Sequence, residues 1–420
     1  MKKMLAVLMT IVLMLTAFPA MADNERVSGL FTYTLKGNGT AVITKFDWEK
    51  NSNKDVFIPS MLDGYTVTGI GDNAFEMGDY RHLRWHVEPV NITLPETIVS
   101  IGEKAFFNVQ ALSINIPNSV QLIMPGAMAT YDYSVRYIVS PDHPVFATIK
   151  GSLYNKTKKE LIAYTSEDIN SSEQKVVVPS GINSIGAYAF YSDGSGWKIS
   201  SIELPESVKT IGDYAFAGTS GYFSMPGVKQ LGVGAFSGCY LYGGSMFSSD
   251  ELTVIADYAF ENCTFKFDWT IPDSVKYIGN SAFKGARFEK NRELKLPSQL
   301  EHIGHSAFAS AYLILWKEEI VFPDSVEYIG AYAFQDVEDL TKVTLPNSDC
   351  EILYGAFIDN DKLTSVTIPS NITSIDTHAF ERGTLTLKVT AGSYGEFFAK
   401  ENGFTYEIEG QEDDLSWLNN

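Results

Sequence analysis

Cysteine is scarce in this chain, which has 420 residues and three cysteines, Cys239, Cys263 and Cys350. So small and odd a number excludes a disulfide framework as the source of stability. Cys239 and Cys263 each follow a phenylalanine by three residues, in neighbouring copies of a motif described below. We expect them to lie close together, and two arrangements stay open: a disulfide bridge, or two buried free thiols packed as small apolar groups.

Positive charge is also in short supply. The chain has 32 lysine and arginine residues against 51 aspartate and glutamate residues, and its formal net charge is −19 at pH 7. An acidic surface repels the phosphates of nucleic acids and anionic lipid headgroups. We therefore expect no nucleic-acid partner, and the excess of acid favours solubility or attraction to cationic partners.

Motifs that carry chemistry are missing from the sequence. It contains no G-x-S-x-G nucleophile elbow, no H-E-x-x-H helix, no phosphate loop and no calcium loop. His82 and His86 have the i, i+4 spacing of two metal ligands on a helix, but no third ligand accompanies them. We expect no catalytic, cofactor-binding or metal-binding residue, and no enzyme. Carboxylate pairs are inevitable among 51 acidic residues, so a glycan-active enzyme is the least favoured hypothesis.

The N-terminus has the pattern of a signal peptide. Residues 1–22, MKKMLAVLMTIVLMLTAFPAMA, begin with two lysines, continue with an apolar run and end in an A-x-A cleavage site. The apolar run is too short to span a bilayer comfortably, so we expect cleavage before Asp23 and no membrane insertion of the mature chain.

Signals that would tether a mature bacterial protein are also missing. No cysteine lies near the apolar run, which excludes a lipid anchor on a cleaved cysteine. LPETI at 94–98 resembles a wall-sorting signal, but it has isoleucine in the glycine position and no apolar tail follows it. Residues 411–420 form an acidic tail without a wall anchor. We expect a protein that is secreted or displayed at the cell surface.

What the sequence has in abundance is one hexapeptide, I-G-x-x-A-F. It is written as IGDYAF at 211–216, and IMPGAM ending at Met128 is a degenerate copy. The last residue of the motif is Phe75, Phe106, Phe190, Phe216, Phe236, Phe260, Phe283, Phe308, Phe334, Phe357 and Phe380. Between Phe190 and Phe380 the copies are 20 to 26 residues apart, which is the period of a leucine-rich-repeat solenoid.

The repeated residues predict how the core is built. One short coil cannot bury its own apolar face, so it must stack on copies of itself. We expect the isoleucine, alanine and phenylalanine of each hexapeptide to point inward, and the glycine to permit a turn that a side chain would obstruct. Burying one phenylalanine is worth about 1.5–3 kcal/mol, so a column of them would dominate the interior. The hexapeptide is therefore a packing device and not an active site.

A short alternating run that ends in proline precedes most hexapeptides. In VTIP, Val366 and Ile368 face one side of a strand and Thr367 the other, and proline ends the strand. Stacked short strands would place the outward residues in one broad, mostly uncharged face suited to protein or glycan contact. This predicted face consists of Phe57, Thr93, Asn115, Val177, Glu203, Ser224, Phe247, Thr270, Lys295, Val321, Thr344 and Thr367.

Two other groups of residues are candidates for contact. Tyr80, Arg81, Arg84 and Trp85 form a basic and aromatic patch in an insertion after the first repeat. A recurrent tyrosine stands two residues before the phenylalanine in several copies, and it serves either as a binding group or as a cover for the core. Its positions are Tyr188, Tyr214, Tyr258 and Tyr332.

The combined pattern, L-x-x-I-x-I-P-x-S-V-x-x-I-G-x-x-A-F-x-x-C, resembles the BspA-like class of leucine-rich repeats, found in exported and surface proteins of bacteria and in some protists. The resemblance implies a mainly β superhelix of about twelve repeats with short parallel strands over residues 56–388. It also implies an N-terminal β-hairpin cap at 23–55 and a C-terminal cap at 389–410. We expect the segment near 143–164 to form an inserted hairpin that protrudes from the solenoid.

The resemblance also implies a function. It implies adhesion to host proteins such as fibronectin or fibrinogen, or to other cells, so we expect an exported recognition protein without a cofactor that binds a protein or glycan, for example a host matrix protein. The alternative is a structural protein of the cell envelope that assembles with itself through exposed strands at a solenoid end. The oligomeric state stays open.

Overall fold

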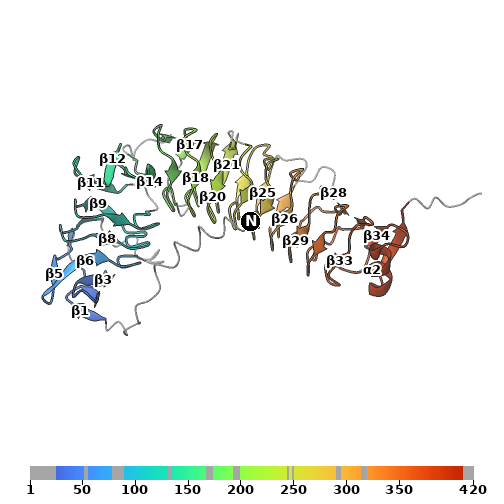
Figure 1. The fold of residues 1–420 in the computed structure, drawn as a ribbon, viewed down its shortest axis with the longest axis horizontal. Helices are drawn as coiled ribbons and strands as arrows, with labels where there is room; N and C mark the ends of the chain where they lie inside the picture. The colour runs from blue at the N-terminus through green and yellow to red at the C-terminus, as the bar shows by residue number, and fades with distance from the viewer. Residues whose placement is uncertain are drawn as a thin grey trace, which may run out of the picture.

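The computed structural model describes residues 25–51, 55–77, 89–130, 134–166, 174–192, 199–243, 246–247, 250–289, 295–313 and 319–409. Over these residues the chain winds into an elongated, curved solenoid whose coils stack from the N-terminal to the C-terminal end (Figure 1). Most coils contribute two short strands, and each pairs in parallel with the equivalent strand of the next coil. The mainly β repeat solenoid that the sequence predicts is confirmed.

The strands that follow the hexapeptide turns form one row along the solenoid, the post-turn row, which consists of three sheets. The first sheet contains β4 (Asp55–Phe57), β7 (Val90–Thr93), β9 (Ala111–Ile116) and β11 (Arg136–Val139). The second contains β15 (Gln174–Val177), β17 (Ile199–Glu203), β19 (Ser220–Ser224), β21 (Tyr240–Gly243), β23 (Thr264–Phe265), β25 (Arg287–Phe288) and β27 (Tyr312–Leu313). The third contains β28 (Glu319–Val321), β30 (Lys342–Thr344), β32 (Ser365–Ile368), β34 (Thr386–Val389) and β35 (Thr405–Ile408).

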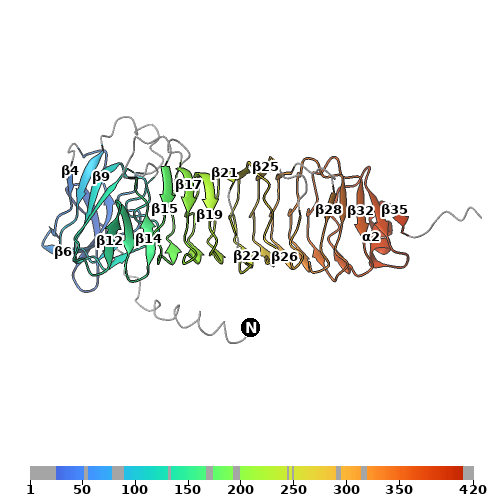
Figure 2. The same ribbon diagram turned by 90° about the horizontal axis from the view of Figure 1, so that it is seen from above.

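The strands that end in the isoleucine of the hexapeptide form a second row, the pre-turn row, on the opposite side of the solenoid (Figure 2). Its N-terminal members are β6 (Tyr65–Ile70), β8 (Ser100–Ile101) and β10 (Leu122–Ile123), and then β16 (Ser184–Ile185), β18 (Thr210–Ile211) and β20 (Gln230–Leu231). It continues with β22 (Val254–Ile255), β24 (Tyr277–Ile278), β26 (His302–Ile303), β29 (Tyr328–Ile329), β31 (Glu351–Ile352) and β33 (Ser374–Ile375).

A column of aromatic rings runs through the core. Between Phe190 and Phe380, the centroids of successive phenylalanine rings lie 5.0 to 5.5 Å apart and the rings are nearly parallel. Two rings outside the motif lengthen the column: Phe46 stacks on Phe75 at 5.0 Å, and Tyr164 stacks on Phe190 at 4.9 Å. The buried core forms two clusters. The N-terminal cluster includes Met128, the last residue of the degenerate hexapeptide. The predicted stacking of the phenylalanines is confirmed.

The hexapeptide forms a tight turn in which two positions have special requirements. The residue two before the phenylalanine is left-handed, with φ of 51° at Tyr214 and 59° at Gly234. The glycine four before the phenylalanine is not left-handed, and it is required because the coils approach closely. A Cβ at Gly212 would lie 2.6 Å from the backbone nitrogen of Ala187 in the preceding coil. A side chain there would indeed obstruct the turn, as predicted, but through the neighbouring coil.

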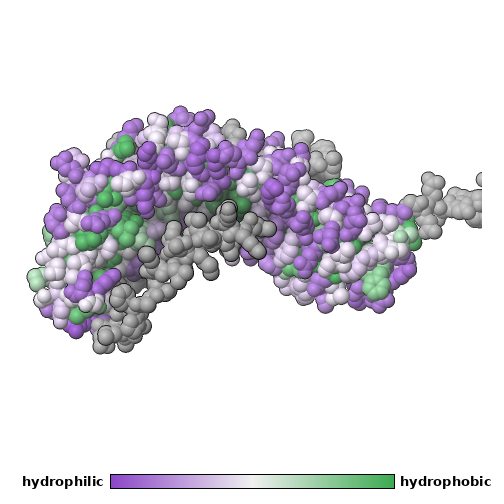
Figure 3. Space-filling model, viewed as in Figure 1, coloured by the Kyte–Doolittle hydropathy of each residue, from purple (hydrophilic) through white to green (hydrophobic). Residues whose placement is uncertain are grey.

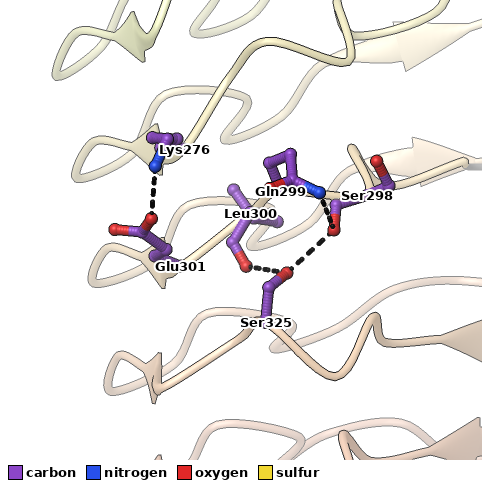
Figure 4. Close-up of polar contacts among 6 residues, drawn as sticks. All are labelled: Lys276, Ser298, Gln299, Leu300, Glu301 and Ser325. Carbon is purple, nitrogen blue, oxygen red and sulfur yellow. Dashed lines mark hydrogen bonds and ion pairs between the residues drawn. The ribbon is translucent and has the colours of Figure 1, made fainter.

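Polar side chains link each coil to the next. The serine of P-x-S-V donates to a backbone carbonyl of the preceding coil, as Ser325 Oγ does to Leu300 O at 2.7 Å (Figure 4). On the pre-turn side, Lys276 Nζ donates to Glu301 Oε1 at 2.7 Å. Within the hexapeptide, Asp213 Oδ1 accepts from the Val233 backbone N–H at 2.8 Å. The serine and aspartate bonds satisfy backbone groups that the short strands leave free, which explains why serine and aspartate recur in the repeat.

The two ends of the solenoid depart from the repeat. At the N-terminal end, β1 (Arg26–Ser28), β2 (Phe31–Leu35) and β3 (Ala41–Phe46) pair antiparallel, and β3 then pairs in parallel with β6. A short strand, β5 (Met61–Leu62), pairs antiparallel with β6. At the C-terminal end, helix α2 (Tyr394–Asn402) begins at the N-cap Ser393 and ends at the left-handed Gly403. Strand β35 then completes the post-turn row.

The segment near 143–164 does not protrude, which corrects the prediction. Its strands β12 (Phe146–Ile149), β13 (Ser152–Asn155) and β14 (Glu160–Ala163) pair antiparallel, and β14 pairs in parallel with β16. His143 fixes the segment to the preceding coil through its Nε2, which contacts the carbonyl oxygen of Pro117 at 3.0 Å, while its Nδ1 accepts from the N–H of Val145 within the segment. The segment therefore forms part of the stack, because an apolar hairpin in this place can bury itself on the coils at both of its ends.

Candidate binding surface

The structure places nine of the twelve predicted face residues on strands of the post-turn row, in three separate ladders. Phe57 lies opposite Thr93 in the first sheet, with Asn115 in the next strand. Val177, Glu203 and Ser224 pair in register in the second sheet. Val321, Thr344 and Thr367 do so in the third sheet. The nine positions therefore line up within each sheet, but they do not form one continuous ladder.

Three predicted residues do not belong to the ladders. Phe247 is half-buried, and its ring packs edge-on against Phe236 and Phe260 at 6.5 and 6.4 Å, so it covers the core. Thr270 and Lys295 are exposed but lie outside any strand. The physical reason is that the strand in these coils begins four residues after the phenylalanine, at Tyr240, Thr264 and Arg287. The described residues between these strands and the three predicted positions form no strand.

Tyrosines that the sequence analysis did not include take outward positions on β19 and β21. Tyr222 on β19 and Tyr240 and Tyr242 on β21 are exposed, at 55%, 53% and 42% of their surface, and the rings of Tyr222 and Tyr242 are 6.1 Å apart. Tyr222 lies two residues before the predicted Ser224, so the two side chains face the same side of β19. Strict alternation along this strand was therefore a signal that could have found Tyr222. Tyr240 and Tyr242 were missed because their coil contains no proline to mark the end of a strand.

A polar groove of about 880 Å³ adjoins Tyr240. We call it the Tyr240 groove. It is lined by Tyr240, Asn262, Thr264, Gly285, Arg287, Glu289, Ser310, Ala311, Tyr312, Asp336 and Glu338. The lining comes from successive coils, because Tyr240, Thr264, Arg287 and Tyr312 occupy one register position on β21, β23, β25 and β27. Two of the lining residues, Thr264 and Ala311, are small and buried, so they take up little of the space beside the larger lining residues.

The groove is rimmed by residues in one unusual backbone conformation. The position two after each phenylalanine is left-handed, with φ of 55° at Asn262, 65° at Gly285, 52° at Ser310 and 53° at Asp336. Ser310 Oγ donates to Asp336 Oδ2 at 3.1 Å. Asparagine, aspartate and glycine tolerate this conformation better than other residues do. The rim is therefore set by the turn that the repeat imposes.

The groove contains one guanidinium and three carboxylates. The Arg287 guanidinium carbon lies 5.9 Å from the ring centroid of Tyr312, within the range of a cation–π contact. Glu289 forms an ion pair with Lys266 of the preceding coil, and Asp336 and Glu338 complete the acidic side. The local charge is thus negative, in keeping with the chain as a whole.

An aromatic stack lies on the opposite, pre-turn row. The ring of His302 is held between Tyr277 at 4.2 Å and Tyr328 at 4.3 Å. Burial, and then the neighbouring charge of His305, lower the pKa of His302 from its usual value. His302 is half-buried rather than a plain surface residue. Within the described part of the chain, no cluster of three or more histidine, cysteine, aspartate or glutamate residues could hold a metal ion.

The recurrent tyrosines before the phenylalanines cover the turns of neighbouring coils. Tyr188 and Tyr214 stack at 5.2 Å, and Lys104 Nζ lies 4.8 Å from the centroid of Tyr188. The Tyr214 ring lies against Gly234, where an added Cβ would come within 2.3 Å of it. Tyr258 and Tyr332 keep 39% and 37% of their surface exposed. These rings serve mainly as a cover, with one edge left in contact with water.

The cysteines are free thiols that take part in packing. Cys239 Sγ donates to Phe216 O at 3.0 Å, and Cys263 Sγ donates to Phe236 O at 2.8 Å. Each thiol thereby bonds the phenylalanine of the preceding coil. Burial raises the pKa of Cys263 well above its usual value. Of the two arrangements that the sequence left open, the structure has the buried free thiols.

Two groups of sequence predictions lie outside the described residues. The patch of Tyr80, Arg81, Arg84 and Trp85 falls in the undescribed range 78–88, and the predicted signal peptide at 1–22 and acidic tail at 411–420 are likewise outside. The described chain has no helix with the length and apolar character that crossing a bilayer demands. Hydrophilic residues cover most of the face in Figure 3, with apolar patches between them.

Solved structures of bacterial repeat proteins are similar to this chain. A leucine-rich cell surface protein from Faecalibacterium prausnitzii has 20% sequence identity and a TM-score of 0.40, over 89% of this chain and 96% of its own. A leucine-rich repeat protein from Eubacterium ventriosum has 19% identity and a TM-score of 0.41, over 74% and 94%. The pneumococcal vaccine antigen PcpA has 17% identity and a TM-score of 0.38, over 92% and 99%. No curated protein shows a significant match.

A family model provides the assignment. The model described as the BspA type leucine rich repeat region matches residues 68–193, 183–314 and 315–393, with six copies. These ranges cover most of the chain and contain most strands of both rows. The family indicates a binding or recognition role. The chain belongs to the BspA-type leucine-rich-repeat family.

Proposed function

We propose that this protein is an exported recognition protein that binds a protein or glycan through the post-turn row and mediates adhesion to host or cell-surface macromolecules. The observation that carries the proposal is the concentration of exposed apolar and aromatic side chains on that row. Phe57, Val177, Tyr222, Tyr240 and Val321 each keep more than half of their surface exposed. Exposed tyrosines and aliphatic groups on one repeated surface are typical of interaction sites.

The proposals of recognition, export and adhesion are each supported by a different observation. The recognition role follows from the family, whereas export rests on the signal-peptide pattern of residues 1–22. Adhesion to a matrix protein is what the resemblance to the family implies. A protein that works outside the cell also accounts for the acidic, soluble surface.

The experiment that tests the proposal is binding of the mature chain, immobilised at a surface, to an array of matrix proteins and glycans. We expect saturable binding to at least one of them, weakened by the double variant Tyr222→Ser/Tyr242→Ser. Tyr354→Ser is the matched control, because Tyr354 is as exposed as Tyr242 but precedes a hexapeptide phenylalanine, away from the post-turn strands. Absence of saturable binding across the array, or equal loss in the control, would refute the proposal.

Self-assembly is the second candidate, and one observation bears on it. Strand β35 ends the third post-turn sheet and pairs in the described chain with β34 alone. Such an edge is a template for another chain. Glu407 stands exposed on this strand and Glu409 follows it, so two copies would bring like charges together. We expect light scattering over a concentration series to show a monomer; a mass that rises with concentration would favour self-assembly.

A further inference from the structure

We propose that the Tyr240 groove binds a cationic segment of an extended peptide, so that lysine or arginine side chains of the partner enter it. This inference rests on the proposed recognition function and names the chemistry of the partner. The groove is larger than the pocket of about 450 Å³ at the N-terminal end, which is lined by the edges of β3 and the first hexapeptide.

The first argument is charge. Among the lining residues, Glu289, Asp336 and Glu338 carry carboxylates and Arg287 the single guanidinium. Lys266 pairs with Glu289, so Asp336 and Glu338 keep the local balance negative. The whole chain has a net charge of −19, so its field attracts cations and repels anionic ligands over longer distances. A sulfated or sialylated glycan would meet repulsion here, and a neutral glycan would gain nothing from the charge.

The second argument is the aromatic lining. Tyr240 lines the groove with more than half of its surface exposed, and Tyr312 lies in the same ladder three coils further on. The ring of Tyr312 already lies within cation–π distance of a guanidinium, that of Arg287. A cation next to a tyrosine face is attracted by the ring quadrupole, and guanidinium groups use this contact most often. The groove therefore offers a cation both a carboxylate and a ring.

The third argument is shape. The groove follows one register position across β21, β23, β25 and β27, so its length lies along the stack of coils. The lining residues Thr264 and Ala311 are buried, and neither presents a long side chain to a ligand. An extended peptide presents alternate side chains to one side, which suits an elongated, shallow groove better than a compact ligand does.

The test measures binding of a fluorescent octapeptide of alternating lysine and threonine to the mature chain. Its counterpart with glutamate in place of lysine, and a neutral oligosaccharide, serve as competing ligand classes. The variant is Asp336→Asn/Glu338→Gln. Asparagine suits the left-handed backbone of Asp336 and its amide oxygen can accept from Ser310. Glu381→Gln/Glu401→Gln makes the same change in charge at exposed positions far along the chain from the groove.

We expect the lysine peptide to bind the wild type more tightly at low salt than at high salt, and the groove variant to bind it about tenfold more weakly. The remote variant should lose less than twofold. Equal losses in both variants would show that overall charge alone attracts the peptide, and would overturn the proposal. Preference for the oligosaccharide or the glutamate peptide would also overturn it.

The outcomes separate this proposal from the function on which it rests. If an array ligand binds the wild type and the groove variant equally, the groove has no role while recognition stands. If the lysine peptide binds in the groove but nothing on the array binds, the cation site stands and the adhesion proposal fails.

Discussion

Replacing Phe260 by alanine tests the aromatic column at its most crowded point. Its ring is fully buried and lies between Phe236 and Phe283, each at 5.3 Å. Phe265 and Trp269 also contact it, at 5.7 and 5.3 Å. Removing a buried phenylalanine costs about 3–5 kcal/mol, which includes the cavity that remains. With ring contacts on several sides and coils fixed by strand pairing, we expect Phe260→Ala to cost about 5 kcal/mol, the upper end of this range.

The assay is unfolding in guanidinium chloride, followed by amide exchange. Phe380→Ala should cost about 3 kcal/mol, because that ring stacks on Phe357 at the end of the column. Phe397→Ala, at an exposed position on α2, should change the free energy of unfolding by less than about 0.5 kcal/mol. Because each coil contacts mainly its neighbours, exchange should accelerate most around Phe260. A cost for Phe260→Ala no larger than that for Phe397→Ala would refute the reasoning.

Three further changes test the repeat geometry and the buried thiol. Gly330→Ala should destabilise the protein by about 1–3 kcal/mol, since its Cβ would lie 2.6 Å from backbone of the preceding coil, while Gly37→Ala, which meets open space, should cost less by the same denaturation assay. Asp213→Ala should cost about 1 kcal/mol by removing the acceptor of the Val233 N–H, and Asp213→Asn should recover most of it. Burial, and then nearby carboxylates, raise the pKa of Cys350 to about 12, so the folded state holds the proton more tightly. Its contribution is full below the unfolded pKa of about 8.5 and falls as pH rises toward 12, so stability measured from pH 8 to 10 should decline more steeply in the wild type than in Cys350→Ala.

The repeat made the fold predictable from sequence. The period, the inward phenylalanines and the parallel strands all follow from a motif that one coil cannot bury alone. Phe46 and Tyr164 were missed as members of the column because they lie outside the hexapeptide. The segment near 143–164 was misjudged because its antiparallel pairing is local, whereas its burial depends on coils far away in the sequence.

The candidate surface was predictable only in part. Proline marks the end of a post-turn strand in the coils of Val177 and Thr367, and there the outward residues lie where the alternation places them. In the coils after Phe236, Phe260 and Phe283, the strand begins four residues after the phenylalanine. The first of these coils contains no proline, and in the other two the proline lies well beyond the strand, so it could not mark where the strand ends. The Tyr240 groove could not be predicted because its lining is assembled from separate coils.

The measurement that most directly tests the recognition function is hydroxyl-radical footprinting of tyrosines with an array ligand bound. We predict that the ligand protects Tyr222, Tyr240 and Tyr242 on the post-turn row and leaves Tyr277 and Tyr328, on the opposite row, as reactive as in the free protein. Protection of Tyr277 and Tyr328 with no change at the three post-turn tyrosines would contradict the account.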